Sequence, residues 1–355
     1  MIPAPLSRGP MLALTSAALF GASTPFAKML VGDVHPALLA AVLYLGSGLG
    51  LLVVRSSRRV LHGDRPLTSE RLGTTGGLWL GAAILFGGVI GPVLLMLGLT
   101  TTTAASASLL LNMEGVLTAL LAWFVFRENF DSRIALGMAS IIAGAAVLSW
   151  QGEATVTNML GPLAVIGACL AWAIDNNLTR KVSLSDPIQI AMLKGLVAGT
   201  INMVLAVLIG APKPSLGPLA GAAILGFVGY GLSLVLFVLA LREIGTARTG
   251  AYYSTAPFIG AVIAFIVLRE PVTPALLISG VLMGFGVWLH LTERHEHEHE
   301  HVPVVHMHPH VHDEHHQHEH GPSDPPGEPH SHLHAHVRLR HEHPHFPDAH
   351  HQHRH

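Results

Sequence analysis

The chain is built from long apolar runs separated by short polar segments. Crossing a hydrocarbon core of about 30 Å takes about 20 predominantly apolar residues in an α-helix. Ten runs meet this requirement, near residues 10–31, 36–54, 74–99, 103–126, 134–150, 160–180, 188–209, 218–241, 246–268 and 274–291. The pattern therefore predicts an all-α membrane protein with ten transmembrane helices.

Composition supports the membrane assignment and sets one segment apart. Of the 355 residues, 50% are hydrophobic and only 12% are charged, about half the share of roughly 25% usual in soluble domains. Residues 1–292 carry 16 Lys and Arg against 11 Asp and Glu, whereas residues 293–355 carry 4 against 11 and hold 23 of the 26 histidines. The single cysteine, Cys169, excludes an intramolecular disulfide and a Cys-based zinc cluster.

The basic residues between the apolar runs predict the orientation of the chain. Positive charge accumulates in the cytoplasmic loops of membrane proteins. With a cytoplasmic N-terminus, the inside segments hold twelve basic residues and the outside segments hold three, which are Lys28, Lys213 and Arg269. An even number of spans returns the C-terminus to the same side. We therefore expect a multi-pass protein of the inner (plasma) membrane with both termini in the cytoplasm.

The two halves of the apolar region repeat each other. Residues 20–28 match residues 172–180 at an offset of 152, and Pro36 answers Pro187 at the start of the second and seventh spans. Because each half has five spans, the second half is inserted upside down. Inverted repeats of this kind are typical of secondary transporters, whose substrate path lies between the repeats. The predicted organisation is one repeat over 1–150, an inverted repeat over 151–292 and a tail over 293–355.

Further matches lead to a family resemblance. Arg127-Glu128 and Arg269-Glu270 close the fourth and ninth spans at an offset of 142, and Trp172-Ala173 begins the second copy of the repeat. Together with Pro36 and Pro187, these features resemble the drug/metabolite transporter superfamily, specifically its EamA-type ten-helix members, over nearly all of residues 10–291. The resemblance implies a secondary carrier, most often an exporter, that is not an enzyme and has no nucleotide-binding domain.

This chain departs from the family pattern at two places. The first half carries Glu114-Gly115 where the second half has Ala256-Pro257, and Leu43-Tyr44 lies near the position of a basic residue that is usual early in the second span. The resemblance does not identify a substrate, because the family is broad.

Glu114 is the first candidate for the transport path. It lies about eleven residues into the fourth predicted span, near the membrane midplane, and no basic residue lies at its depth in neighbouring spans. A charge at that depth is costly and marks a functional site unless it is paired. A carboxylate in this position is suited to exchanging protons or binding a cation, and Asn112 is expected beside it.

Asp175 and Lys194 form the second candidate, on the sixth and seventh spans at similar depths. Two interpretations stay open. In one, they are a buried structural ion pair that keeps two helices in register. In the other, Asp175 with Asn176 and Asn177 forms a polar wall of the translocation cavity, although three consecutive residues point in different directions around a helix.

The tail is expected to be disordered without a ligand, since it is rich in His, Pro, Glu and Asp and poor in large apolar residues. Neutral imidazole is a common ligand for zinc, copper, nickel and cobalt, and the near absence of Cys and Met disfavours Cu(I). Passive low-complexity sequence and an engineered tag are the alternatives. The predicted metal ligands are His295, His297, His299, His301, His306, His308, His310, His312, His315, His316, His318 and His320.

The leading hypothesis is a secondary active exporter of divalent transition-metal ions, nickel or cobalt first and zinc second, whose tail binds the metal. Histidine-rich tails of bacterial nickel and cobalt exporters are similar to this one. The alternatives are an exporter of amino acids or other small organic metabolites, with an incidental or regulatory tail, and a membrane-anchored metal buffer. No cofactor is required, and the expected partners are membrane lipid and the transported solute, with no nucleic acid. Either one chain or a homodimer forms the functional unit.

Overall fold

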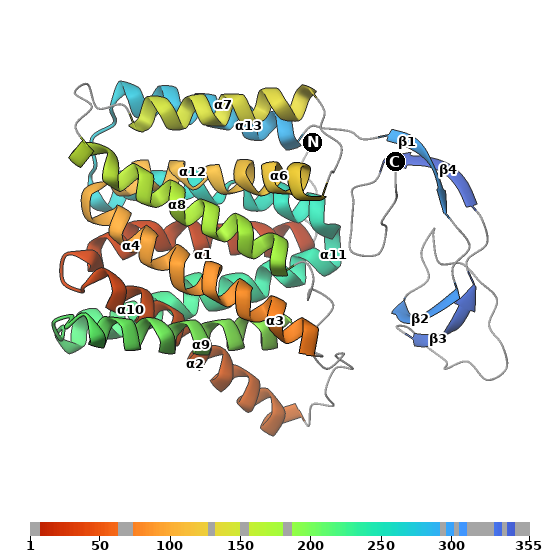
Figure 1. The fold of residues 1–355 in the computed structure, drawn as a ribbon, viewed down its shortest axis with the longest axis horizontal. Coiled ribbons are helices and arrows are strands. Elements are labelled where there is room, and N and C mark those ends of the chain that lie inside the picture. Colours follow the sequence, from red (N-terminus) through yellow and green to blue (C-terminus); the bar gives the residue numbers. More distant parts are fainter. Residues whose placement is uncertain are drawn as a thin grey trace, which may run out of the picture. The chain divides into compact units, whose positions relative to one another are not determined.

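The computed structural model describes residues 8–62, 74–126, 132–149, 156–179 and 187–291, together with four short segments of the tail (Figure 1). Residues 1–293 form one compact unit and residues 294–355 a second. The helices are α1 (Arg8–Val31), α2 (Pro36–His62), α3 (Thr74–Ala83), η1 (Ile84–Ile90), α4 (Gly91–Thr101), α5 (Ala104–Leu110), α6 (Met113–Phe126), α7 (Ser132–Ser149), α8 (Val156–Thr179), α9 (Pro187–Leu208), α10 (Leu216–Leu225), η3 (Gly226–Leu232), α11 (Ser233–Tyr253), α12 (Ala256–Leu268) and α13 (Pro274–Leu291).

Each of the ten predicted spans has a helical counterpart. Four spans are divided into consecutive segments: α3, η1 and α4 make the third, α5 and α6 the fourth, α10, η3 and the start of α11 the eighth, and the end of α11 with α12 the ninth. The expected break near residues 242–245 is absent, because α11 is helical throughout that range. The chain instead reverses direction within α11 before it returns along α12 (Figure 1).

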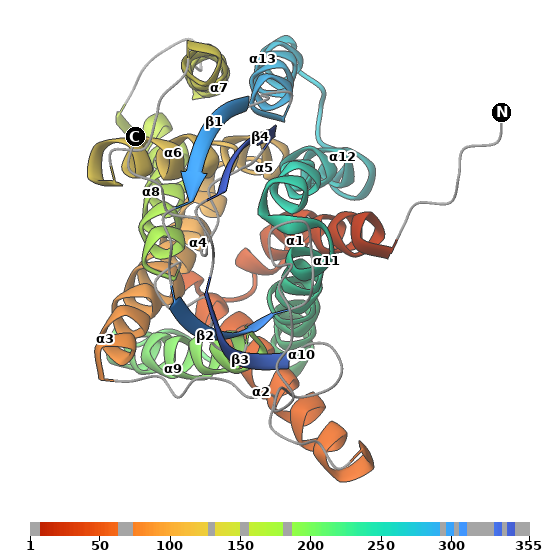
Figure 2. The same cartoon turned by 90° about the vertical axis from the view of Figure 1, so that its right-hand side faces the viewer.

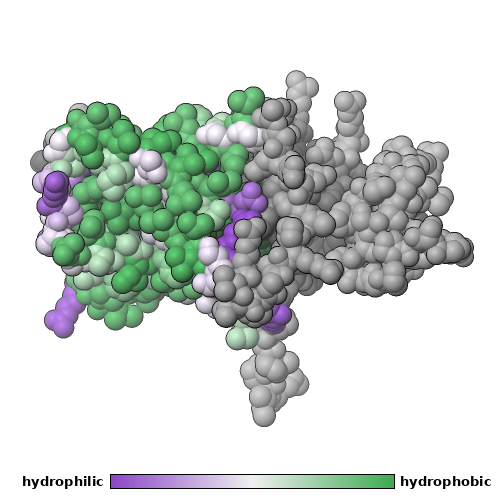
Figure 3. Space-filling model, turned by 90° about the horizontal axis from the view of Figure 1, so that it is seen from below, coloured by the Kyte–Doolittle hydropathy of each residue, from purple (hydrophilic) through white to green (hydrophobic). Residues whose placement is uncertain are grey.

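The surface of the helical unit fits a membrane setting. Seven of its helical stretches are long and apolar enough to cross a bilayer, and α12 and α13 are shorter apolar helices. Large apolar side chains such as Leu78, Val207 and Val281 lie on the outside, and one face is covered mostly by hydrophobic residues with hydrophilic ones toward its ends (Figure 3). Such a surface is stable in lipid, where apolar groups avoid water.

The two repeats pack against each other. Helix α1 lies beside α11 and α12 of the second repeat, and α8 lies beside α4 and α6 of the first (Figure 2). Corresponding helices also meet, since α2 packs on α9 and α7 packs on α13. Equivalent helices run in opposite directions, so we define the proximal end as the end where α1 begins and the distal end as the end where α1 finishes.

Glycines permit close helix crossings, as between α2 and α9. A Cβ atom added at Gly48 in α2 would lie 2.5 Å from the backbone nitrogen of Leu196 in α9. One added at Gly195 in α9 would lie 2.6 Å from the backbone nitrogen of Gly48. Small residues let membrane helices approach until their backbones touch, which explains why these two positions lack a side chain.

Two π-helical segments occupy equivalent positions in the repeats. Segment η1 covers Ile84–Ile90 and η3 covers Gly226–Leu232, and the offset between them is the same 142 residues seen between the Arg-Glu pairs. The helix breaks at Leu111–Asn112 and Ser254–Thr255 are related by a nearly equal offset, 143 residues. π-Helical turns are rare and often occur at functional sites. Their presence in both repeats therefore marks the third and eighth spans as candidate functional regions.

The described part of the tail contains four strands, β1 (Glu296–His301), β2 (Val305–His310), β3 (His330–Ala335) and β4 (Leu339–Pro344). Strand β1 pairs antiparallel with β4, and β2 pairs antiparallel with β3. The alternation of histidine with other residues has a period of two, which matches the alternating faces of a β-strand.

Candidate translocation site

Asp175 and Lys194 form an ion pair between α8 and α9. The Nζ atom of Lys194 donates to the two carboxylate oxygens of Asp175 at 2.6 and 2.8 Å. Thr179, one helical turn beyond Asp175, donates to the same carboxylate at 2.8 Å and accepts from Lys194 at 3.2 Å. The two charged side chains are largely buried, with 14% of Lys194 and 10% of Asp175 exposed. The pairing inferred from their depths is present, and it satisfies both charges.

Glu114 is the second residue of α6, just after the break between α5 and α6. Its Oε1 atom accepts a hydrogen bond of 2.8 Å from Nδ2 of Asn176 on α8. In the part of the chain that the structure describes, no basic side chain is paired with this carboxylate, and Asn176 is exposed. Because Asn176 directly follows Asp175, one short stretch of α8 contacts both Glu114 of the first repeat and Lys194 of the second.

Two of the predicted path residues have other partners. The Nδ2 atom of Asn177 donates to the carbonyl of Ala173 on its own helix at 2.9 Å. Asn112 is buried and donates to the carbonyl of Leu109, with a long contact of 3.8 Å to the sulfur of Met283 on α13. These contacts place Asn112 against α13, and its expected role beside Glu114 stays a prediction. Its bond to Leu109 lies at the break itself, where a side chain that bonds to the backbone competes with helical bonding.

The carbonyl groups of η1 collect side chains from three helices. The carbonyl of Gly87 accepts hydrogen bonds from Tyr44 on α2 at 2.7 Å and from the indole of Trp172 on α8 at 2.9 Å. The carbonyl of Gly88 accepts one of 2.9 Å from Asn202 on α9. Sequence reasoning assigned no such role to η1, and the adjacent pair Gly87-Gly88 was the available signal.

Gly87 also makes room for the ion pair. A Cβ atom at this position would overlap the carboxylate of Asp175. The equivalent contact in the other repeat joins Gly229 and Ser23, where an added Cβ would lie 2.8 Å from the Cβ of Ser23. The backbone arrangement is thus repeated, but the carboxylate is present in one copy only.

Each charged residue of this region therefore has an uncharged equivalent in the other repeat. Subtracting 152 from Asp175 gives Ser23, and adding 142 to Glu114 gives Ala256. The equivalent of Lys194, by the offset of 151 between Pro36 and Pro187, is Leu43. We call Glu114 on α6, Asp175 on α8 and Lys194 on α9 the polar cluster.

A cluster of aromatic side chains joins α1 and α2 of the first repeat to η3 and α11 of the second. The ring centroid of Phe20 lies 6.0 Å from that of Tyr230 and 5.6 Å from that of Tyr253. Tyr44 lies 5.7 Å from Tyr230, and Phe237 lies 4.8 Å from Tyr253. Since Tyr44 also contacts η1, the aromatic cluster and the polar cluster meet at that residue.

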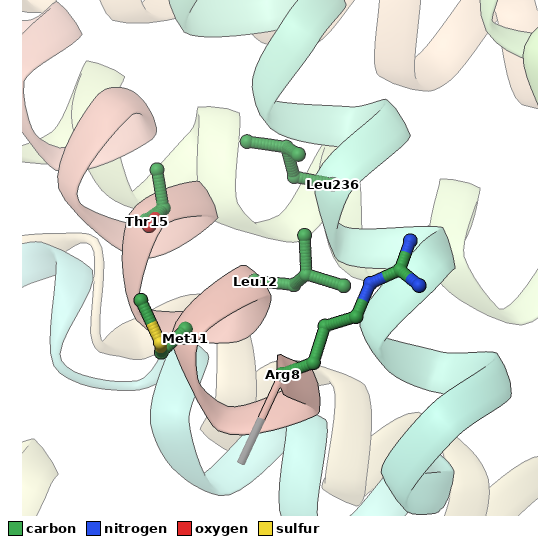
Figure 4. Close-up of a pocket in the computed structure, with 5 residues that line it drawn as sticks. All are labelled: Arg8, Met11, Leu12, Thr15 and Leu236. Atoms are coloured by element: carbon green, nitrogen blue, oxygen red, sulfur yellow. The ribbon is translucent and has the colours of Figure 1, made fainter. Parts of the chain in front are cut away.

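A separate open cavity of about 400 Å³ lies between α1 and α11 near the proximal end (Figure 4). It is lined by Arg8, Met11, Leu12, Thr15 and Leu236. None of the predicted transport residues lines it, so this cavity is distinct from the polar cluster.

The predicted metal ligands divide into two groups. Six histidines lie in strands, namely His297, His299 and His301 in β1 and His306, His308 and His310 in β2. His295, His312, His315, His316, His318 and His320 lie outside the described residues. Among the side chains that the structure does describe, no group of three or more His, Cys, Asp or Glu could hold a metal ion.

Comparison with known proteins gives matches over both repeats. A model of the EamA-like transporter family matches residues 7–150 and again residues 159–292. An uncharacterized transporter from Methanothermobacter thermautotrophicus is 32% identical over 287 residues, which cover 78% of this chain and 84% of that protein. The uncharacterized transporter YvbV of Bacillus subtilis is 26% identical over 293 residues, which cover 79% and 90%.

The fold is also found among solved structures. One crystal structure aligns with a TM-score of 0.59 and 18% identity, covering 79% of this chain and 94% of that chain. The double family match coincides with the internal repeat read from the sequence, and the prediction of two inverted five-helix repeats is confirmed.

Proposed function

The chain belongs to the EamA-like transporter family, and from this premise we propose that it is a secondary active exporter of a cationic solute, with divalent nickel or cobalt first and zinc second. The observation that carries the proposal is Glu114, a carboxylate without a basic partner among the described residues. A charge inside a membrane protein is retained where it serves a substrate or ion pathway.

Glu114 would alternate between a proton and the exported cation. Its carboxylate contacts the second repeat through Asn176, so occupancy of Glu114 can influence how the repeats meet. Exchange at one carboxylate couples the two movements, because the proton and the cation compete for the same group. The drive is then an ion gradient, as is usual for carriers built from inverted repeats.

The Asp175–Lys194 pair would position the path and not carry the substrate. Each charge already has its counter-ion, and Thr179 satisfies a further hydrogen bond. The pair fixes α9 against α8 directly beside Asn176. Because the pair has no net charge, Glu114 would be the group that binds a positive ion.

The tail supports the choice of a metal ion as the cation. The twelve-to-three distribution of basic residues favours a cytoplasmic C-terminus, which is the side from which an exporter draws its substrate. A tethered ligand presents an effective concentration in the millimolar range for short flexible linkers. The tail would therefore raise the local metal concentration at the proximal end of the path.

The aromatic cluster favours a second candidate, an exporter of amino acids or other small organic metabolites. Phe20, Tyr44, Tyr230 and Tyr253 form a continuous set of rings at the boundary between the repeats. Aromatic faces bind organic substrates through apolar contact and organic cations through cation–π attraction. On this alternative, the tail is regulatory or incidental.

Uptake into vesicles with the proximal end outside tests the proposal. With an imposed proton gradient, radioactive nickel or cobalt should accumulate with wild-type protein, and Glu114→Gln should lower accumulation at least tenfold. Asp33→Asn is the matched control, because it makes the same carboxylate-to-amide change in an exposed loop. Unimpaired accumulation in Glu114→Gln would remove Glu114 from the mechanism, whereas accumulation of amino acids but no metal would establish the second candidate.

A further inference from the structure

A carboxylate at the distal end holds the short link between α4 and α5. The two carboxylate oxygens of Glu270 accept hydrogen bonds from the backbone nitrogens of Ala104, at 2.7 Å, and Ala105, at 2.8 Å. These residues begin α5 and are buried. The first four backbone N–H groups of a helix have no acceptor within the helix. Glu270 therefore satisfies two buried donors that α5 itself leaves unpaired.

Lys28 holds the other side of the same link. Its Nζ atom donates to the carbonyl oxygens of Leu99 at 2.5 Å and Thr102 at 2.9 Å. Helix α4 ends at Thr101, so these acceptors lie in its last turn and just beyond it. Hydrogen bonds with a charged partner are roughly twice as strong as bonds between neutral groups. The link is thus held on both sides by the stronger kind of hydrogen bond.

The contacts of the link tie the two repeats together. Lys28 and the link belong to the first repeat, whereas Glu270 belongs to the second. The chain turns toward the link at Arg269, which is exposed and ends α12 in the left-handed conformation with a φ of 52°. Residues other than glycine and asparagine rarely adopt this conformation. The place of Glu270 therefore depends on an unusual backbone turn as well as on its charge.

Beneath the link, α1, α5 and α12 close the distal end. A Cβ atom added at Gly260 in α12 would lie 2.7 Å from the carbonyl oxygen of Gly21 in α1 and 2.7 Å from the Oγ atom of Ser108 in α5. Only 1% of Ser108 is exposed. Along the fourth span, Ser108 lies between the distal end and Glu114. A solute that moves from Glu114 toward the distal end has to separate these helices.

The closed end also contains two buried hydroxyl groups that oppose closure. The Oγ1 atom of Thr102 and the Oγ atom of Ser108 are buried without a hydrogen-bond partner in the part of the chain that the structure describes. Helix α8 covers the first, since a Cβ atom added at Gly161 would overlap the hydroxyl of Thr102. A buried polar group without a partner costs free energy, and water satisfies it when the end opens. The charged contacts therefore favour the closed state, and the hydroxyls favour the open state.

We infer that Glu270 and Lys28 form a distal latch, which keeps this end closed by holding the link between α4 and α5. Alternating access in carriers with inverted repeats is largely a rocking of one repeat against the other. Because the latch joins a charge of each repeat to one link, such a movement breaks it. Release of the link then allows α5 to move away from α1 and α12. The latch concerns the gate, so it does not depend on whether the solute is a metal ion or an organic metabolite.

Thiol labelling of Ser108→Cys in a Cys169→Ser background tests the latch. Glu270→Met removes both acceptors and should raise the labelling rate by a small water-soluble reagent at least tenfold. Glu270→Gln should cause a smaller rise, because its amide oxygen still accepts a hydrogen bond. Asp33→Asn is the control, since it neutralises a carboxylate in an exposed loop at the same end, and it should stay within twofold of the parent. Unchanged labelling in Glu270→Met would overturn the latch.

A second reporter separates release of the link from general loosening. Ser279→Cys makes the same change at a fully buried serine of α13, whose hydroxyl also has no partner among the described residues. Ser279 lies five residues after the start of α13 and Ser108 four after the start of α5, so their depths below the distal end are similar. Ser279 packs against Gly144 of α7. Glu270→Met should leave its labelling unchanged, and an equal rise at both reporters would overturn the latch.

Lys28→Met tests the second charge of the latch. It removes the donors to the link and keeps a long side chain, and it should raise labelling of Ser108→Cys at least fivefold. Labelling of Ser279→Cys should again stay within twofold of the parent. No rise at Ser108→Cys would remove Lys28 from the latch.

A matched pair of variants at Arg269 tests the backbone turn. Arg269→Asn and Arg269→Val remove the same charge, but asparagine tolerates the left-handed conformation and a β-branched residue does not. Labelling of Ser108→Cys should stay within twofold of the parent for Arg269→Asn and rise at least fivefold for Arg269→Val. Equal rates in the two variants would contradict the role of this turn in placing Glu270.

Thr102→Val should act in the opposite direction. It exchanges the unpaired hydroxyl for a methyl group and keeps the backbone carbonyl that accepts a hydrogen bond from Lys28. The closed end then no longer contains this unpaired group, so labelling of Ser108→Cys should fall at least threefold. General damage to the fold would raise labelling instead. A rise, or an unchanged rate, would contradict the balance between the latch and the buried hydroxyls.

Discussion

Neutralising Asp175 should expose the strength of the ion pair between α8 and α9. Asp175→Asn leaves Lys194 buried with 14% of its side chain exposed and without its counter-ion. Removing one partner of a buried pair costs about 3–5 kcal/mol. Because the pair lies near the proximal end, we take the lower value, about 3 kcal/mol. At about 1.36 kcal/mol for each factor of ten, this corresponds to about a 150-fold increase in the fraction of molecules in which this region is open.

The rate at which the Cys169 thiol reacts measures this open fraction without an introduced cysteine. It is the only cysteine of the chain, it is fully buried, and it lies in α8 six residues before Asp175. When opening and closing are fast relative to modification, the rate of reaction with a thiol reagent follows the equilibrium between closed and open states. Asp175→Asn should therefore react about 100-fold faster than wild type.

The double variant Asp175→Asn, Lys194→Met separates charge from shape. It removes both charges, and its reaction rate should return to within about fivefold of wild type, since exchanging a buried pair for uncharged groups of similar volume is often nearly neutral. Asp33→Asn should react at the wild-type rate. A single variant as slow as wild type, or a double variant as fast as the single, would refute the view that Asp175 serves to neutralise Lys194.

Three further predictions concern packing, the tail and topology. Gly87→Ala should destabilise the protein by about 1–3 kcal/mol, as overpacking does, because the new methyl group overlaps the carboxylate of Asp175, whereas Gly77→Ala meets nothing within 4 Å and should be neutral in thermal unfolding. Truncation after Thr292 should weaken metal export at low concentration and preserve the maximal rate in vesicle assays, and equal loss at all concentrations would contradict a capturing tail. Ser57→Cys in a Cys169→Ser background should resist impermeant thiol reagents in intact cells, and ready labelling would reverse the assigned orientation.

The apolar pattern by itself determined the architecture. Ten runs of sufficient length specify ten helices, since a segment in lipid must satisfy its backbone hydrogen bonds internally. The matches at offsets of 152 and 142 then required an inverted repeat. The pairing of Asp175 with Lys194 also followed from the sequence, because depth along a helix is proportional to residue number and two opposite charges at one depth attract.

Only the tertiary structure decided which side chains meet around the helices. Asn112 and Glu114 are two residues apart, and the first contacts α13 whereas the second contacts α8. The contacts of Gly87 with Tyr44, Trp172 and the carboxylate of Asp175 depend on a π-helical turn and on packing between repeats. Hydropathy specifies how deep a residue lies, but the rotation of each helix is set by its neighbours, which come from the other half of the chain.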